Sequence, residues 1–303
     1  MSGAWPDRGG HVWPKDGEVV RDDGTVVRYA VQGPRGAPTV VLCAGFLCPD
    51  NFWRDLAPDL VDDHRVLMLN YRGVGASSEA GGGARPPEAS AYTIAQLAGD
   101  VAAVIDAERA GPATVVGHSM GVQVALAVWQ ARPDLVRHLA LLAGSVATPF
   151  ETFYGTRAAM AVFPVLSMVL PALPRPMVAL PMRALELPVA MPVAHLIRAL
   201  GPNTPDEGMR LYRDHFGRVD PRTAIWTARG MHAFDATDWL DQVTVPTFVA
   251  VGDADYWTPP AIGAAMVESL PDADLLVVEG ASHALPIEFP ATLLPRIREL
   301  TRR

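Results

Sequence analysis

One serine in this sequence has the setting of a nucleophile. Ser119 lies in the sequence G-H-S-M-G at positions 117–121, between an apolar run at 114–116 and a segment of helical composition. A serine in G-x-S-x-G between a strand and a helix occupies a sharp turn, and the flanking glycines leave room for the close backbone packing of that turn. Its hydroxyl is expected at the carboxyl end of a sheet, where doubly wound folds place their sites. The other interpretation is a tight turn with an idle serine.

With this motif in this position, the chain resembles the α/β-hydrolase superfamily over residues 18–300, apart from an insert at 148–236. The resemblance implies a nucleophile, an acid and a histidine in that chain order. The acid that it implies is Asp255, which matches the aspartate of the family pattern G-x-x-D-x-x-T-P at positions 252–259. Asp253 is the weaker candidate, because an aspartate there is also suited to holding the turn through a hydrogen bond to backbone.

The histidine that the resemblance implies is His283, in G-A-S-H at positions 280–283, after an apolar strand and before the last expected helix. A serine hydroxyl is a poor nucleophile at neutral pH, so it needs a histidine as base and a carboxylate that supports the histidine. His283 would take the proton as Ser119 attacks a carbonyl carbon, and Asp255 would fix the imidazole tautomer and stabilise the imidazolium. The seven other histidines are interpreted as surface or interior residues, and His118 is expected to point away from the nucleophile.

The resemblance also implies two backbone N–H groups as an oxyanion hole. They belong to Met120, the residue after the nucleophile, and to Phe46, just past the apolar run at 39–43. Each donor of this kind is typically worth about 10²–10³ in rate. The family often has His-Gly where this chain has Ala44-Gly45. Because the donors are main chain, this departure concerns the support of the loop and not the donors themselves.

A second segment, N-Y-R-G-V-G-A-S at positions 70–77, is similar to the D-x-R-G-x-G-x-S segment of the same superfamily, with Asn70 in place of the aspartate. Its glycines are expected to make a tight turn and Arg72 to hydrogen-bond neighbouring loops. Phosphate binding is the alternative, but the spacing fits neither a Walker loop nor a dinucleotide fingerprint. Cys43 and Cys48 lack a paired zinc-binding spacing. We therefore expect no cofactor and no metal.

The elements that must position these residues alternate along the chain. Apolar runs predict buried strands at 39–43, 66–69, 114–116, 139–143, 247–251 and 275–278, and helices are expected at about 93–109, 120–131, 259–270 and 290–300. A β-hairpin at 18–31 precedes them, and residues 78–90 are expected to form a mobile surface loop. Because apolar strands alternate with helices, the fold class is α/β, with a mostly parallel doubly wound sheet between helix layers.

Residues 148–236 do not continue this alternation and are predicted to form an inserted helical lid subdomain, with residues 1–147 and 237–303 as the core. The stretch 158–200 carries seven prolines and five methionines. A membrane-spanning helix is the rival interpretation, but prolines and charges interrupt the apolar run, so short helices separated by proline breaks are expected. The methionines have two interpretations: they line a site for an irregular apolar ligand, or they fill a small core.

Composition excludes several other classes of protein. Half of the 303 residues are hydrophobic and 19% are charged, which is typical of a compact globular protein. The net charge of −8 argues against a nucleic-acid partner. The first twenty residues hold charged side chains and no apolar core of signal-peptide length, which predicts a cytoplasmic location. Two cysteines are too few for a disulfide scaffold.

Together these features predict a serine hydrolase that cleaves a carboxylic ester through an acyl-enzyme, with a small hydrophobic acyl ester as its partner. Hydrolysis of thioesters, lactones, monoacylglycerols or carbon–carbon bonds, acyl transfer and cofactor-free perhydrolysis use the same three residues and stay open as alternatives. Aspartate at position 119 would have indicated dehalogenase or epoxide hydrolase chemistry, so the serine at this position disfavours both. Two alternatives come from other classes: a ligand receptor that retains the triad, and a scaffold whose insert docks on a membrane surface.

Overall fold

The computed structural model describes residues 13–48, 50–83, 87–148, 158–184, 187, 189–196, 200–205, 207, 212, 215 and 217–303. Several sequence expectations fall in part outside these residues. They concern residues 1–12 of the N-terminal segment, the tip 84–86 of the expected surface loop, and, within the insert, the stretch 149–157 together with Glu186 and Pro188.

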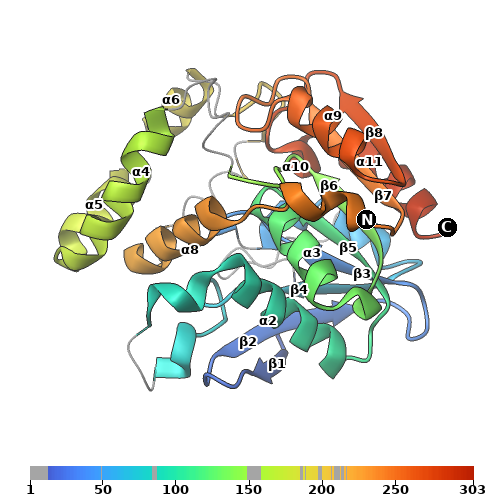
Figure 1. The fold of residues 1–303 in the computed structure, drawn as a ribbon, viewed down its shortest axis with the longest axis horizontal. Helices are drawn as coiled ribbons and strands as arrows, with labels where there is room; N and C mark the ends of the chain where they lie inside the picture. Colours follow the sequence, from blue (N-terminus) through green and yellow to red (C-terminus); the bar gives the residue numbers. More distant parts are fainter. Residues whose placement is uncertain are drawn as a thin grey trace.

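An eight-stranded sheet forms the centre of the molecule (Figure 1), with the strand order β1-β2-β4-β3-β5-β6-β7-β8. The strands are β1 (Gly17–Val20), β2 (Val26–Gln32), β3 (Thr39–Cys43), β4 (Arg65–Leu69), β5 (Ala113–His118), β6 (Val136–Leu142), β7 (Thr247–Gly252) and β8 (Ala273–Val278). β2 is antiparallel to both β1 and β4, and the other neighbours are parallel. The N-terminal hairpin and the mostly parallel sheet expected from the sequence are therefore confirmed.

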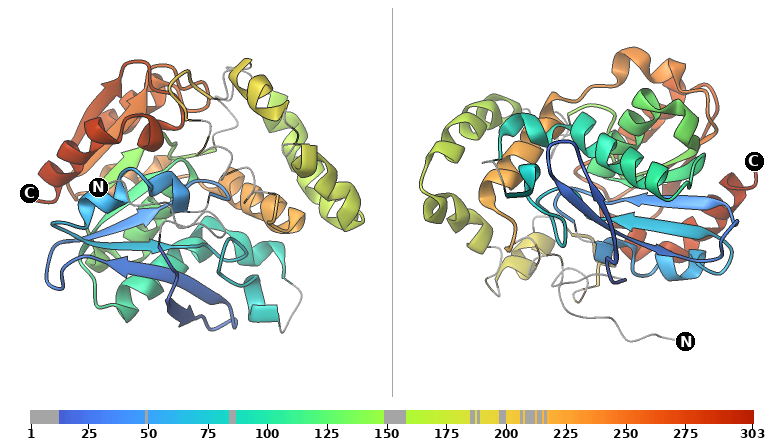
Figure 2. Two further views of the ribbon diagram at one scale, coloured as in Figure 1. Left: turned by 180° about the vertical axis from the view of Figure 1, so that it is seen from behind. Right: turned by 90° about the horizontal axis from the view of Figure 1, so that it is seen from below.

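Helices cover both faces of the sheet (Figures 1 and 2). The helices of the core are α1 (Ala57–Leu60), α2 (Ile94–Ala107), α3 (Met120–Ala131), α9 (Pro260–Ser269), α10 (Leu285–Glu288) and α11 (Pro290–Leu300), with short 3₁₀ helices η1 (Asp50–Trp53), η4 (Pro133–Leu135) and η8 (Thr237–Gln242). In β7, Val249 and Val251 pack with α2, α3 and α9, whereas Phe248 and Ala250 pack with α1 and α11. Both faces of the inner strands are thus buried, which explains their unbroken apolar runs.

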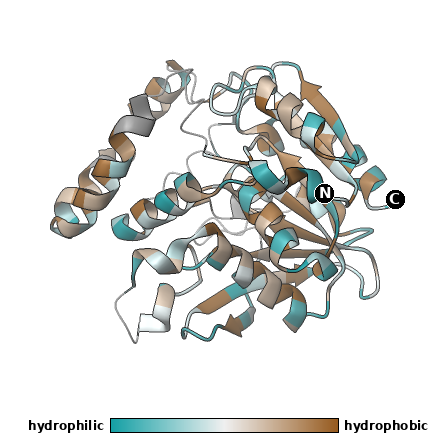
Figure 3. Ribbon diagram, viewed as in Figure 1, coloured by the Kyte–Doolittle hydropathy of each residue, from teal (hydrophilic) through white to brown (hydrophobic). Residues whose placement is uncertain are grey.

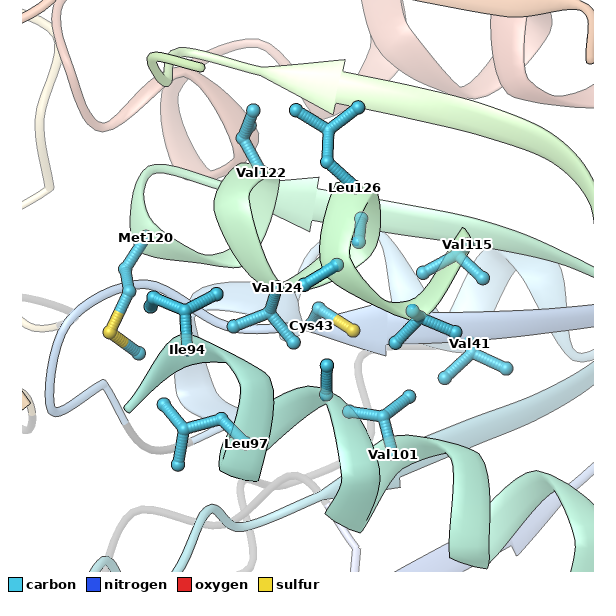
Figure 4. Packing of buried hydrophobic residues seen from close by; sticks show 14 of the residues in the cluster. Val41, Cys43, Ile94, Leu97, Val101, Val115, Met120, Val122, Val124 and Leu126 are labelled. Carbon is cyan, nitrogen blue, oxygen red and sulfur yellow. The ribbon is translucent and has the colours of Figure 1, made fainter. Parts of the chain in front are cut away.

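The larger core lies between the sheet and helices α2 and α3 (Figure 4). Val41 and Val115 reach into it from β3 and β5, and Leu97 and Val124 meet them from the two helices. Thr93 caps α2, because its side chain accepts a hydrogen bond from the backbone N–H of Gln96. This packing fixes the first turn of α3, which follows Ser119 directly.

The register of the sheet brings several strand ends to one edge. Cys43 pairs with Gly117, and His118 pairs with Leu142. β7 and β8 end in register with one another, since Gly252 pairs with Val278. The segments that follow β3, β5, β7 and β8 therefore start at the same edge, and these are the segments that carry the predicted site residues.

The expected surface loop at 78–90 is more ordered than the sequence suggests. It contains the 3₁₀ helices η2 (Ala80–Gly83) and η3 (Ala89–Tyr92) on either side of its undescribed tip. Tyr92 is fully buried, and its hydroxyl donates to Glu79 and accepts from the backbone N–H of Ala80. One aromatic side chain thus anchors both described ends of the segment to the core.

The insert is helical in its described residues, with α4 (Ala158–Val169), η7 (Leu170–Ala172), α5 (Arg175–Ala184), α6 (Ala190–Leu196) and α8 (Pro221–Ala233). Most breaks fall near prolines, but Pro164 lies inside α4. α8 packs on the main core, since Val219, Ala224 and Met231 belong to the larger core cluster. Helices α4 and α5 contact α8 and form a layer outside it (Figures 1 and 2).

Helices α4 to α6 expose an unusual number of apolar side chains (Figure 3). On α4, Val162, Val165, Leu166 and Val169 follow helical spacing and are all exposed. Met168 is 69% exposed and Met177 on α5 is 60% exposed, so these two methionines do not fill a core. None of the described helices has the length and apolar character needed to cross a bilayer.

Candidate active site

The structure brings together the three side chains that the sequence singled out. The Nε2 atom of His283 lies 2.9 Å from the Oγ atom of Ser119. On the other side of the ring, Nδ1 of His283 lies 2.9 Å from Oδ2 of Asp255. The serine follows β5, the aspartate follows β7 and the histidine follows β8. Serine, imidazole and carboxylate therefore form one continuous chain of hydrogen bonds.

Ser119 sits in a backbone conformation that its neighbours impose. Its φ is 56° and its ψ is −119°, a region that a residue with a side chain occupies at a cost of about 1–3 kcal/mol. A Cβ atom on Gly117 would lie 2.2 Å from the carbonyl oxygen of Gly121, and one on Gly121 would lie 2.0 Å from that of Cys43. Only glycine fits at these two positions, which is the packing reason for the G-x-S-x-G pattern.

The surroundings of Asp255 determine the tautomer of His283. The carboxylate is buried and accepts hydrogen bonds from the backbone N–H groups of Trp257 and Thr258 and from the hydroxyl of Thr258, at 2.7–2.9 Å. Burial raises the pKa of Asp255, but the neighbouring His283 and the hydrogen bonds from Thr258 outweigh it and hold the pKa below its ordinary value. An ionised Asp255 only accepts, so Nδ1 of His283 carries a proton and Nε2 is free to accept from Ser119.

His118 is closer to the site than the sequence suggested. Its Nε2 atom does not serve Ser119 but lies 2.8 Å from the carbonyl oxygen of His283, and the two imidazole rings are 5.3 Å apart between centroids. Burial and the nearby His283 lower the pKa of His118 to about 3, so the ring is neutral at physiological pH. Trp257, also missed, stacks on His283 with centroids 5.2 Å apart. The available signal was position in the sequence, because His118 directly precedes Ser119 and Trp257 lies two residues after Asp255.

The two predicted oxyanion donors lie on segments next to Ser119. Met120 is the first residue of α3, and the first N–H groups of a helix have no partner within it. Phe46 lies in the turn after β3, closed by a hydrogen bond from the Cys48 N–H to the Gly45 carbonyl at 3.1 Å. A Cβ atom on Gly45 would lie 3.2 Å from Cβ of Ser119, so this turn passes directly beside the serine.

Tyrosines support this turn where the family often has a histidine. The hydroxyl of Tyr71 donates to the carbonyl of Ala44 at 3.2 Å, and the hydroxyl of Tyr212 donates to the carbonyl of Phe46 at 3.3 Å. Tyr71 comes from the segment after β4, and Tyr212 comes from the insert. The loop therefore has side-chain support from two separate parts of the chain despite the Ala44-Gly45 departure.

Comparison with known proteins agrees with this arrangement of strands and loops. A family model described as the alpha/beta hydrolase fold matches residues 38–167, which include β3 to β6 and the turn at Ser119.

The chain belongs to the α/β-hydrolase superfamily.

Individual α/β-hydrolases resemble the chain over nearly its whole length. A putative carbamate hydrolase, RutD, of Azorhizobium caulinodans is 26% identical over 271 residues, covering 86% of this chain and 89% of that protein. A hydrolase from Pseudomonas aeruginosa superimposes with a TM-score of 0.74 at 22% identity, covering 94% and 97% of the two chains. A thermophilic esterase from Thermogutta terrifontis gives a TM-score of 0.71 at 23% identity, with the same coverage. The two solved structures share the fold.

Asp253, the weaker acid candidate, has a structural contact in this α/β-hydrolase. Its Oδ1 atom accepts a hydrogen bond from the backbone N–H of Gly280 at 2.7 Å. The carboxylate therefore holds backbone, as the alternative interpretation suggested, but it holds the loop of His283 and not its own turn. The two aspartates after β7 thus reach the same loop at two points.

The segment at 70–77 braces the hydrolase core away from the reacting atoms. Arg72 is buried and donates to both carboxylate oxygens of Asp100, to Asp23 and to the carbonyl of Ala91. Asn70, in place of the family aspartate, accepts from the backbone N–H of Ala76 at 3.2 Å. These contacts agree with the structural interpretation of the segment.

An apolar cluster adjoins the predicted site on the insert side. It consists of Ala44, Cys48, Phe52, Ala284 and Ile287, with Met191, Leu200 and Tyr212 of the insert packed against it. Burial raises the pKa of Cys43 to about 12 and that of Cys48 further, so both thiols are protonated and inert at neutral pH. Within the described part of the chain, no three His, Cys, Asp or Glu side chains converge as a metal site requires.

Proposed function

We propose that the protein is a serine hydrolase that cleaves carboxylic esters through an acyl-enzyme intermediate. The observation that carries this proposal is the unbroken chain from Ser119 Oγ through the His283 imidazole to the Asp255 carboxylate, with both links at 2.9 Å. Such a chain converts a weak hydroxyl nucleophile into a reactive one, because the proton has an acceptor at the moment of attack. Membership of a hydrolase superfamily supports the same chemistry.

The first half of the reaction follows from this geometry. Ser119 Oγ attacks the carbonyl carbon of the ester while its proton passes to Nε2 of His283, and Asp255 stabilises the imidazolium that forms. The negative charge on the former carbonyl oxygen is received by the N–H groups of Met120 and Phe46. When the tetrahedral intermediate collapses, the bond to the alcohol oxygen breaks and Nε2 returns the proton to that oxygen. The alcohol leaves and the acyl group stays on Ser119.

The second half repeats these steps with water. Nε2 of His283 takes a proton from a water molecule, and the hydroxide oxygen bonds to the acyl carbon. Collapse of the second intermediate returns the proton to Oγ of Ser119 and releases the carboxylic acid. The protein is thereby restored without any cofactor in the balance of atoms.

The proposed substrate class rests on the apolar cluster that adjoins the predicted site. The cluster around Phe52 and Ile287, closed by Met191 and Leu200, is apolar and adjoins the turn that carries Phe46. Sites for small molecules are mostly apolar with a few polar groups that fix orientation. We therefore propose an ester with a hydrophobic acyl or alcohol part. The esterase named among the structural neighbours is consistent with an oxygen ester.

The role proposed for residues 148–236 is that of a lid over this site. Its support is that Met191, Leu200 and Tyr212, all from the insert, lie against the apolar cluster and the turn of Phe46. A cover of this kind shields the site from bulk solvent and sets the shape of the substrate that enters. The remaining alternatives, which act on thioesters, lactones or carbon–carbon bonds, differ in substrate and not in these three side chains.

The experiment is a substrate panel read beside covalent labelling. The wild-type protein should react with a fluorophosphonate and turn over p-nitrophenyl esters, while Ser119→Ala should show neither activity and keep its fold by circular dichroism. The panel covers acyl lengths from two to twelve carbons, with a matched thioester and a lactone. Labelling of Ser119→Ala would refute the assignment of the nucleophile. Labelling of the wild type without multiple turnovers would instead indicate a receptor that retains the triad.

A further inference from the structure

The loop that carries His283 is joined to the insert through one carboxylate. Glu288 of α10 accepts hydrogen bonds from both the backbone N–H and the hydroxyl of Ser282, each at 2.7 Å. The same carboxylate accepts from the hydroxyl of Thr204, in the insert segment 200–205. Ser282 and Thr204 are both buried. A single side chain thus connects the insert to the residue directly before the histidine.

Two further contacts make the same connection. The amide nitrogen of Asn203 donates to the carbonyl of Gly280 at 3.2 Å. A Cβ atom on Gly201 would lie 2.7 Å from Cβ of Ser282 and 2.8 Å from Oε1 of Glu288, so the backbone of Gly201 lies directly against this pair. The segment 201–204 therefore contacts the loop of His283 at Gly280 and at Ser282.

The core holds the other side of the loop. Asp253 accepts from the N–H of Gly280 at 2.7 Å, and His118 contacts the carbonyl of His283 at 2.8 Å. These contacts fix the ends of the loop, whereas the backbone N–H of Ser282 between them is held by Glu288. Hydrogen bonds to an ionised carboxylate are roughly twice as strong as neutral ones. Thr204 is the third donor to Glu288, and it is the one that comes from outside the loop.

We propose that Glu288 is a positioning residue through which the seating of the insert controls the reactivity of Ser119. With Thr204 in place, the carboxylate holds Ser282 and thereby sets the imidazole of His283 against the serine hydroxyl. When Thr204 moves away, the carboxylate loses one of its three donors and the loop gains freedom at Ser282. The proposal rests on the proposed function, because its readout is the nucleophilicity of Ser119. It gives residues 200–205 an effect on chemistry that is separate from any contact with substrate.

The decisive variant is Thr204→Val, which keeps the shape of the side chain and removes only the donor from the insert. We expect its second-order rate of labelling by a small methyl fluorophosphonate to fall about 3- to 10-fold, since small displacements of reacting groups cost up to about 10²-fold. With p-nitrophenyl acetate, kcat should fall and KM should stay within about twofold. Glu288→Gln should lower the labelling rate further, because it weakens both ties to Ser282 as well.

Thr223→Val is the matched control. Thr223 is also a buried threonine of the insert whose hydroxyl donates to a glutamate, Glu79, at 2.8 Å, but that pair does not touch the loop of His283. Its Tm should fall as much as that of Thr204→Val while the labelling rate per folded molecule stays at the wild-type value. Equal labelling rates for Thr204→Val and the wild type would overturn the coupling. An equal loss of labelling rate in Thr204→Val and Thr223→Val would overturn it as well.

A double variant tests the route. If Thr204 acts through Glu288, then Thr204→Val combined with Glu288→Gln should label no more slowly than Glu288→Gln alone. If the double variant lost the product of the two single fold-losses in labelling rate, the two substitutions would act independently, and this would contradict the proposal. Failure of the proposed function has a different signature, since Ser119→Ala would then label like the wild type whatever residue stands at 204.

Discussion

The carbonyl oxygen of His283 and the Nε2 atom of His118 lie 2.8 Å apart, deep at the carboxyl edge of the sheet. His118 must donate in this contact, because a carbonyl oxygen only accepts. The buried ring is neutral, so its other nitrogen, Nδ1, carries no proton, and that atom has no hydrogen-bond partner among the described residues. The imidazole of His118 thus holds the backbone of His283 and adds no charge beside the imidazole of His283.

The first prediction follows from this contact. His118→Phe keeps a ring of similar shape and removes the donor to His283, so kcat for a short ester should fall about tenfold as the base loses one brace. His138→Phe is the control, since His138 is also buried on a neighbouring strand but bonds Thr114, far from the serine in the sheet register. The measurement is the rate of p-nitrophenyl acetate hydrolysis per folded molecule. Equal rates in the two variants would contradict a role for His118.

The second prediction concerns stability against pH. The pKa of His118 is about 3 in the folded state, against about 6.5 when unfolded. Between these values the unfolded chain binds a proton that the folded chain does not, so the free energy of unfolding falls as the pH is lowered from 6.5 towards 3. From pH 7 to pH 5 the contribution of His118 to this loss is about 2 kcal/mol.

Urea unfolding at both pH values, with His118→Gln as the comparison, measures that contribution. The variant should lose about 2 kcal/mol less than the wild type over this range. Burial also lowers the pKa of His138, to about 4, and this part of the pH dependence should remain in the variant. If the free energy of unfolding fell by the same amount from pH 7 to pH 5 in both proteins, His118 would take up its proton in the folded state as readily as in the unfolded state, which contradicts the prediction.

A third prediction uses the backbone of the nucleophile. Ser119 has φ 56°, where alanine is strained and glycine is not. Ser119→Ala and Ser119→Gly both remove the hydroxyl and should both be inactive, but the glycine variant should be the more stable of the two by about 1 kcal/mol. Thermal unfolding of the pair measures this as a difference of roughly 1–2 °C in Tm. A less stable glycine variant would show that the turn is not strained.

The fourth prediction compares two arginines that each bind a pair of aspartates. Arg72 is buried with Asp100, so Arg72→Met should destabilise the fold by about 3 kcal/mol, because a buried carboxylate loses its principal partner. Arg132 pairs with Asp106 and Asp134 on the surface, and Arg132→Met should have no measurable effect. Urea unfolding distinguishes the two. Labelling of Ser119 per folded molecule should be unchanged in both.

Most of the central sheet could be predicted because burial on both faces leaves a strong local pattern. The apolar run at 39–43 is β3 to the residue, and the helix expected at about 93–109 is α2, Ile94–Ala107. The three candidate site residues were implied by the resemblance to the α/β-hydrolase superfamily, whose motifs they match, and each of them follows a recognisable strand. The positions of these residues along the chain therefore made the prediction of the candidate site possible.

The contacts between loops could not be predicted in the same way. His118 contacts the carbonyl of His283 across 165 residues of sequence, and Thr204 contacts Glu288 across 84, and no local pattern encodes which loops meet. The interior proline of α4 is a second case. Pro164 removes one helical hydrogen bond, yet the helix continues through it, so the rule that proline ends a helix failed there.

The exposed apolar helices α4 to α6 have a consequence for how the protein can diversify. Leu180 is 68% exposed and Leu196 is 81% exposed, whereas in the described part of the chain the hydrogen-bond partners of Ser119, His283 and Asp255 lie outside residues 158–196. This stretch can accept substitutions, or be exchanged for another, while the chain of hydrogen bonds to Ser119 stays intact. The hydrogen-bonded chain and these exposed helices therefore occupy separate stretches of sequence, so the helices can vary while the three side chains keep their arrangement.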